Sequence, residues 1–226
     1  MDNIINMDQS KALSEYSKNY IKKNNNELAK LFHGFLKKTI NIKNVLYYYS
    51  FEYYSVIELN LIDIYEKLYI TGRIRINLET NIPEINLIEA INETFSPKSS
   101  KFKNVPCLEK KNIYTTPPYL IFILNRRIAT QYYSGSFIYS NKVDLSCVIE
   151  NKENNNNYEI VSIIKENVNI VDNNNISDNI NEYNYKYITI NKNDSGIFYY
   201  YENNKREEGL FEKKGFYDHI LIFKVL

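Results

Sequence analysis

Residues 117–126 read PPYLIFILNR, and this stretch decides the fold. The run from Tyr119 to Leu124 contains only aliphatic and aromatic residues. Two prolines precede it, and Asn125, Arg126 and Arg127 follow it. A short apolar run with such borders predicts a central, buried strand. We therefore expect a β-sheet built around residues 119–124.

The sequence on both sides of this strand favours further strands. Segments rich in β-branched and aromatic residues predict strands, and a Gly-containing turn at 191–196 predicts a hairpin between its neighbours. The expected strand regions are 39–61, 74–76, 137–149, 158–164, 185–190, 197–201 and 219–225.

Two segments predict helices. Residues 9–31 show partial 3.6-residue periodicity, and residues 86–95 show it with Asn86 placed to cap the first turn. Residues 167–184 are polar and rich in Asn without periodicity, which predicts a mobile loop. With helices early and strands late, the chain is expected to be a single α+β domain.

Composition excludes several classes of function. The chain has 28 basic and 27 acidic residues, a net charge of +1, so generic nucleic-acid binding is not expected. No apolar run approaches the length of a membrane span, and the first residues do not resemble a secretory signal. Two cysteines, Cys107 and Cys147, make no disulfide framework, and two histidines cannot form a His-rich metal cluster.

Several segments occur in an order that resembles a known family. The most specific is PPYLIFILNR itself; the others are short and carry weight through their order. They are 31–34 (LFHG), 86–91 (NLIEAI) with 95–97 (FSP), 158–163 (YEIVSI), 185–188 (YKYI), 198–202 (FYYYE) and 220–223 (ILIF). Together they resemble the catalytic domain of ubiquitin-specific proteases from about residue 12 onward.

The resemblance implies a papain-like cysteine-protease fold with fingers and palm, truncated at its N-terminal thumb side. Residues 1–226 would form one divergent domain. Within it, 1–33 is a helical lead-in, 34–115 the fingers-like part, and 116–226 the palm-like sheet with a mobile loop at about 166–184.

The chain departs from the family at its catalytic positions. Ala12 stands where the helix after the nucleophile carries an Asp, and the start of the chain leaves no room for the nucleophile box. Lys186 occupies the place of the family histidine, Glu202 the place of the orienting acid, and Glu166 that of a non-catalytic histidine. A lysine with a pKa near 10.4 is protonated at neutral pH and cannot act as the base. We therefore expect no catalytic residue.

The family's fingers often bind zinc through two Cys-x-x-Cys pairs. The resemblance places these pairs on 42–45 and 107–110, where only Cys107 is a cysteine. One thiolate cannot build a tetrahedral zinc site, so we expect neither a metal nor another cofactor. Ile42 and Val45 are expected to replace the ion by apolar packing.

The remaining candidate residues have ordinary explanations. His33 and His219 are expected in structural or surface roles, and Cys147 as a core thiol. Arg126 and Arg127 are expected at a solvated strand end, with partner contact as the alternative.

Three functions remain open. The first is a catalytically inactive, ubiquitin-binding or protein-binding pseudoenzyme in the cytoplasm or nucleus, with Tyr185 and Tyr187 lining the groove for the ubiquitin tail and ubiquitin or a ubiquitinated protein as partner. The second is the C-terminal part of an active deubiquitinase whose nucleophile lies elsewhere. The third is a scaffold in RNA processing without affinity for ubiquitin. No membrane partner is expected in any of them.

Overall fold

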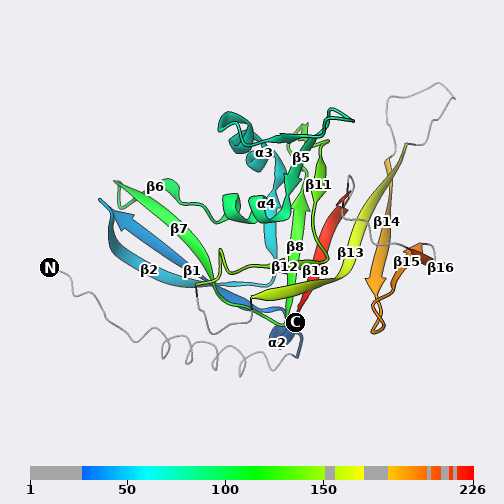
Figure 1. Cartoon of the computed structure of the whole chain (residues 1–226). Helices are drawn as coiled ribbons and strands as arrows, with labels where there is room; N and C mark the ends of the chain where they lie inside the picture. The colour runs from blue at the N-terminus through cyan, green and yellow to red at the C-terminus, as the bar shows by residue number, and fades with distance from the viewer. Residues whose placement is uncertain (1–26, 151–155, 171–182, 203–204, 210–213, 216–217) are drawn as a thin grey trace.

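The computed structural model describes residues 27–150, 156–170, 183–202, 205–209, 214–215 and 218–226. In these ranges the chain is rich in strands and mixed in class, with an eight-stranded sheet, here called the long sheet, at its centre. A four-stranded sheet, here called the curled sheet, projects from one side of it (Figure 1). The described helices are α2 (Glu27–Phe32), α3 (Leu61–Ile70) and α4 (Leu87–Thr94). None of them is long and apolar enough to cross a membrane.

The predicted central strand is confirmed as β8 (Tyr119–Asn125). It pairs antiparallel with β18 (Asp218–Val225) and parallel with β3 (Ile57–Asn60). Leu120, Phe122 and Leu124 are buried completely or nearly so, whereas the alternate residues are half-buried. One face of the strand therefore carries the core, and burial of each of these side chains contributes about 1.5–3 kcal/mol.

The far half of the long sheet consists of β13 (Asn157–Ile170), β14 (Tyr183–Lys192), β15 (Phe198–Glu202) and β16 (Lys205–Gly209), with β12 (Lys142–Asp144) paired to β13. The predicted hairpin is confirmed, since β14 pairs with β15 across a turn in which Gly196 has φ 85°. The predicted loop at 166–184 is partly wrong. Residues 166–170 pair with 183–187 and extend the ladder, and residues 171–182 lie outside the described ranges.

The curled sheet contains β1 (Gly34–Ile42), β2 (Val45–Tyr54), β6 (Lys98–Phe102) and β7 (Val105–Thr115) in the order β2-β1-β7-β6. Two-residue turns at 43–44 and 103–104 close its hairpins, with φ between 48° and 66° at all four positions. Positive φ at both central residues is the geometry of a type I′ turn, which matches the twist of the flanking strands. The single strand region expected at 39–61 is therefore divided among β1, β2 and β3.

The helices show where a local sequence pattern was sufficient to predict an element and where it was not. Helix α4 begins as predicted, with the side chain of Asn86 accepting a hydrogen bond from Ile88 N at 2.9 Å. Helix α3 was not predicted, although four residues at helical spacing are buried in it: Leu61, Ile62, Ile64 and Leu68. Of the helix expected at 9–31, only α2 falls in the described ranges.

Short strands complete the elements around the helices. One small sheet contains four short strands: β4 (Arg75–Ile76), β5 (Pro83–Asn86), β11 (Ser136–Ile138) and β17 (Lys214–Gly215). A second contains β9 (Arg127–Ile128) and β10 (Gln131–Tyr132). The strand expected at 74–76 is thus confirmed as β4. The strand expected at 137–149 is partly wrong, since only β11 and β12 within it are strands and residues 145–149 form a turn and an isolated bridge to Ile113.

Arg126 is buried, so the expectation of a solvated strand end is wrong for this residue. Its guanidinium donates to the carbonyl oxygens of Gly135 at 2.9 Å, Asp218 at 3.3 Å and Tyr133 at 3.4 Å. Burial lowers the pKa of Arg126. Arg127 next to it is exposed as expected.

A short segment after β12 ties the curled sheet to the long sheet. Residues 145–150, here called the strap, lie against β7, where Ile113 N donates to Val148 O and Glu150 N donates to Ile113 O. The buried ammonium of Lys37 on β1 forms an ion pair with Glu150. Ile113 and Ile149 belong to the same core cluster as Leu59 and Phe122. The two sheets therefore share one hydrophobic core.

Candidate functional site

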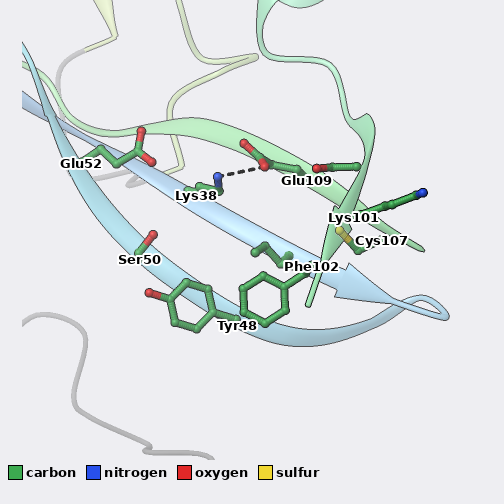
Figure 2. Close-up of a pocket in the computed structure, with 10 residues that line it drawn as sticks. Lys38, Tyr48, Ser50, Glu52, Lys101, Phe102, Cys107 and Glu109 are labelled. Carbon is green, nitrogen blue, oxygen red and sulfur yellow. Dashed lines mark ion pairs between the residues drawn. The ribbon is translucent and has the colours of Figure 1, made fainter. Parts of the chain in front are cut away.

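A pocket of about 410 Å³ lies on one face of the curled sheet. Side chains alternate between the faces of a strand, so paired residues such as Lys38 and Ser50, or Ile40 and Glu109, lie on the same face. All four strands contribute to the pocket, which opens on the concave face (Figure 2). It is lined by Lys38, Ile40, Tyr48, Ser50, Glu52, Ser100, Lys101, Phe102, Cys107 and Glu109.

An ion pair lies at the centre of this concave face. Lys38 Nζ is 2.9 Å from a carboxylate oxygen of Glu109 on the neighbouring strand (Figure 2). The hydrogen bond to Glu109 raises the pKa of Lys38, although partial burial acts in the opposite direction. A second pair joins Lys111 to Glu52 at 2.7 Å. These two carboxylates are matched by two ammonium groups, so the face has little net charge.

Aromatic rings close the end of the curled sheet. The ring of Phe102 on β6 stacks on Tyr48 of β2 with centroids 5.7 Å apart, and meets the edge of Tyr47 at the same distance. Because β2 and β6 are the two outer strands of the sheet, this contact brings opposite edges together. Ring pairs of this kind contribute about 0.5–1.5 kcal/mol each beyond the area they bury.

The structure corrects the expected match of residues 42–45 and 107–110 to the two zinc-binding Cys-x-x-Cys pairs of the family. Residues 42–45 do surround a two-residue turn, but the matching turn of the other hairpin is flanked by Phe102 and Val105. Cys107 and Lys110 lie three residues apart on β7 and therefore on opposite faces, so they cannot bind one ion together. No group of three potential metal ligands occurs in the described part of the chain. The packing expected from Ile42 and Val45 is also wrong, since Val45 is mostly exposed.

The two cysteines lie in environments that do not favour a nucleophile. Cys107 is buried on the pocket face. His33 precedes β1 at the opposite end of the curled sheet, and Cys107 lies level with Ile42, which places the two roughly 30 Å apart along the strand. Cys147 is exposed, so the expectation of a core thiol is wrong. Partial burial nevertheless raises the pKa of its thiol, which reduces the thiolate fraction at neutral pH. His219 lies half-buried on β18.

The positions that the family resemblance singles out lie in the far half of the long sheet. Tyr185, Lys186 and Tyr187 fall in β14, where they pair with Val168, Asn167 and Glu166 of β13. Glu202 ends β15, one residue beyond the Thr189–Tyr201 pair. Lys186 and Glu202 therefore lie toward the same end of the β14–β15 ladder. Only the backbone is described at residues 185–187 and 202. The expected roles of their side chains therefore stay predictions.

Lys38, Glu52 and Phe102 were not among the residues predicted from the sequence, and Ser50 entered only as one of the positions that carry the family resemblance. Their period-2 spacing with Ile40 and Tyr48 was a usable signal, because residues two apart share a face of a strand. The cross-strand register that brings β2 and β7 to either side of β1 was not available from that spacing.

No protein-family model matches the sequence, and no curated protein sequence matches it. Solved structures do match. A chain in the Ubp8–Sgf11–Sgf73–Sus1 SAGA DUB module aligns with 95% of this chain at 13% identity and a TM-score of 0.63. A chain of the yeast SAGA DUB module aligns with 92% at 12% identity and 0.63. A chain of the SAGA DUB module bound to monoubiquitin aligns with 95% at 11% identity and 0.62.

These identities establish similarity of fold alone. The chain spans 46%, 45% and 46% of the three matched chains, less than half of each. The chain therefore has a strand-rich, mixed fold similar to part of chains found in SAGA DUB-module structures, and the papain-like fingers and palm stay a prediction.

Proposed function

We propose that this chain binds ubiquitin, or a ubiquitinated protein, on the concave face of the curled sheet and does not itself cleave ubiquitin conjugates. The observation that carries the proposal is the fold match over 95% of the chain to a DUB-module structure bound to monoubiquitin. In this proposal the curled sheet corresponds to the fingers, and the long sheet corresponds to the palm.

The chemistry of the concave face suits a protein surface. Four of its charges are paired as Lys38–Glu109 and Lys111–Glu52, and hydroxyl and apolar groups also line the pocket. Interfaces between proteins are mixed in this way, with aromatic side chains enriched and unpaired charges depleted. Tyr185 and Tyr187 on β14 are proposed to line the groove for the ubiquitin tail, as the family resemblance implies.

The same resemblance supports the absence of peptidase activity. A cysteine protease needs a thiolate, a base that activates it and an acid that orients the base. Lys186 stands at the position of the base, and a protonated ammonium cannot accept the proton of a thiol. Glu202 is a longer carboxylate than the usual Asp at the orienting position.

Titration of isotope-labelled ubiquitin with the whole protein, followed by NMR, tests binding. We expect saturable shifts, weakened strongly by Ser50→Arg, because the longer side chain fills the concave pocket lined by Ser50. Thr39→Arg is the matched control, since Thr39 lies on the opposite face of the same sheet. Equal binding by both variants would remove the concave face from the proposal. No shifts with folded protein would sink ubiquitin binding and favour the RNA-processing scaffold.

Two assays address catalysis. Ubiquitin with a C-terminal fluorogenic amide should not be hydrolysed by the protein, and ubiquitin with a C-terminal electrophile should form no adduct with Cys107 or Cys147. Turnover that Cys107→Ala or Cys147→Ala abolishes would show that the chain is an enzyme by itself.

A second candidate function is one part of an active deubiquitinase whose nucleophile lies outside this chain. The observation that favours it is that the chain spans less than half of the matched chains. A ubiquitin-reactive thiol acquired only when a second polypeptide is added would support this candidate over the pseudoenzyme.

A further inference from the structure

The end of the curled sheet exposes a group of apolar side chains, here called the tip patch. They come from the two hairpin ends and are between 40% and 68% exposed: Val45, Leu46, Tyr47, Tyr48, Val105 and Leu108. Leu46 and Leu108 both pair with Asn41 and lie on one face of the sheet end, whereas Tyr48 pairs with Ile40 and lies on the other. Single exposed apolar residues are ordinary on protein surfaces, but several gathered at one end of a sheet indicate an interaction site.

Positive charge surrounds this patch. Lys43 and Lys103 lie in the two type I′ turns, and Lys101 lies on β6. All three are exposed. Residues 41–48 and 100–108 contain these three lysines and no Asp or Glu. None of the three forms an ion pair with the described part of the chain, whereas Lys38 and Lys111 further along the sheet are both paired.

The unpaired outer edge of β2 helps to decide which class of molecule binds the tip patch. β2 is the outer strand of the curled sheet and pairs only with β1 among the described strands. Its outward backbone N–H and C=O groups can bind the backbone of an extended peptide, as edge strands commonly do. Hydrocarbon cannot satisfy such groups, which disfavours insertion of the tip into a lipid bilayer.

The lysines exclude a symmetric contact between two copies of the tip, because that contact would bring like charges together. Four of the six patch residues are aliphatic: Val45, Leu46, Val105 and Leu108. They favour a peptide with apolar side chains over nucleic acid, whose bases stack on aromatic rings such as those of Tyr47 and Tyr48. An acidic peptide with apolar side chains matches both the tip patch and the three lysines around it, here called the rim: Lys43, Lys101 and Lys103.

We propose that the tip patch binds an extended, acidic segment of a partner protein. The segment lies along the outer edge of β2, its apolar side chains cover Val45, Leu46 and Tyr47, and its carboxylates pair with Lys43, Lys101 and Lys103. This site shares Tyr48 and Lys101 with the lining of the concave pocket, but Lys43, Lys103 and the outer edge of β2 lie outside that pocket, and the proposal does not rest on ubiquitin binding.

The experiment uses the whole protein and a fluorescein-labelled synthetic peptide of ten residues, in which Asp and Glu alternate with Leu and Phe. Fluorescence anisotropy reports binding. We expect saturable binding that weakens with added salt, as exposed charge pairs require. The same peptide with Lys in place of the acidic residues should not bind.

The variant Lys43→Gln/Lys103→Gln removes two charges from the rim, and we expect binding to weaken about three- to tenfold at low salt. Lys142→Gln/Lys224→Gln removes two exposed charges outside the tip and should leave binding unchanged. Circular dichroism verifies that both variants are folded, and ubiquitin titration should be the same for both.

Three outcomes would overturn the proposal. The folded protein does not bind the acidic peptide, or the rim variant binds it as tightly as the control variant does. The third outcome is that the protein sediments with phosphatidylserine-containing vesicles through the tip lysines and does not bind the peptide, in which case the surface recognises lipid.

Discussion

At the scale of single residues, Arg126 and Arg127 show how burial decides the role of a charge. The two are neighbours in sequence, but Arg126 is buried among three carbonyl oxygens while Arg127 is exposed. Removing a buried donor leaves each of its acceptors without a partner and without water, which costs about 1–3 kcal/mol per group.

We therefore expect Arg126→Ala to lower the free energy of unfolding by about 3 kcal/mol or more. Arg127→Ala is the matched control and should change it by less than about 1 kcal/mol, as surface substitutions generally do. Urea denaturation measures both. Similar losses in the two variants would contradict the assignment of Arg126 as a buried structural donor.

The ion pair in the concave pocket predicts a dependence on pH. Glu109 raises the pKa of Lys38, so the pair stabilises the fold fully below the ordinary pKa of lysine. That contribution is lost as the pH rises through the raised pKa. We expect Lys38→Met to be less stable than the wild type by about 0.5–1 kcal/mol at pH 8, and the gap to narrow only once the pH rises above the ordinary pKa of lysine, 10.5. No gap at pH 8 in urea denaturation, or a gap that already shrinks between pH 8 and 9.5, would argue against the pair.

At the scale of elements, local signals sufficed where one segment determines its own structure. Helix α4 was predicted because the Asn86 cap and its apolar face lie within ten residues. Strand β8 was predicted because its apolar run has clear borders. The turns at Lys43-Asn44 and Lys103-Asn104 were missed, since neither contains the Gly that marks most such turns.

The candidate site was less predictable than the fold for a related reason. Lys38, Ser50 and Glu109 are far apart in sequence and meet only through the register of three strands. Register depends on pairing across the whole sheet. Composition and motifs gave no information on it, and the family resemblance pointed to other positions.

The aromatic closure at the sheet end yields a prediction at this scale. Phe102→Ala removes the ring that joins β6 to β2, at an expected cost of about 1–2 kcal/mol. Amide hydrogen exchange should become faster in 45–48 and 98–102 and stay unchanged in β8 and β18. Val105→Ala, on the other side of the same turn, is the control. Unchanged exchange after Phe102→Ala would show that the rings do not hold the edges together.

At the scale of the whole molecule, the strap makes the two sheets dependent on each other. The buried Lys37 of β1 pairs with Glu150 of the strap, and its ammonium lies 5.8 and 6.0 Å from the ring centroids of Tyr49 and Tyr114. Removal of one member of such a pair leaves a buried charge, whereas removal of both is far less costly.

We expect Glu150→Gln to lower the free energy of unfolding by about 1–3 kcal/mol, with the partial exposure of Glu150 moderating the loss. Lys37→Met/Glu150→Gln should lose no more than the single variant does. Urea unfolding followed by circular dichroism and by tyrosine fluorescence should give coincident transitions for the wild type. Additive losses in the double variant would show that the two side chains are not coupled.

The closure of the sheet end by Phe102, Tyr47 and Tyr48 has a physiological consequence. A sheet end held by a metal ion and thiolate ligands comes apart when a chelator removes the ion or an oxidant converts the thiolates. Rings packed together need neither an ion nor a reduced thiol. Their attraction instead depends on the hydrophobic effect, which weakens on cooling. The packing of these three rings should therefore loosen as the temperature falls.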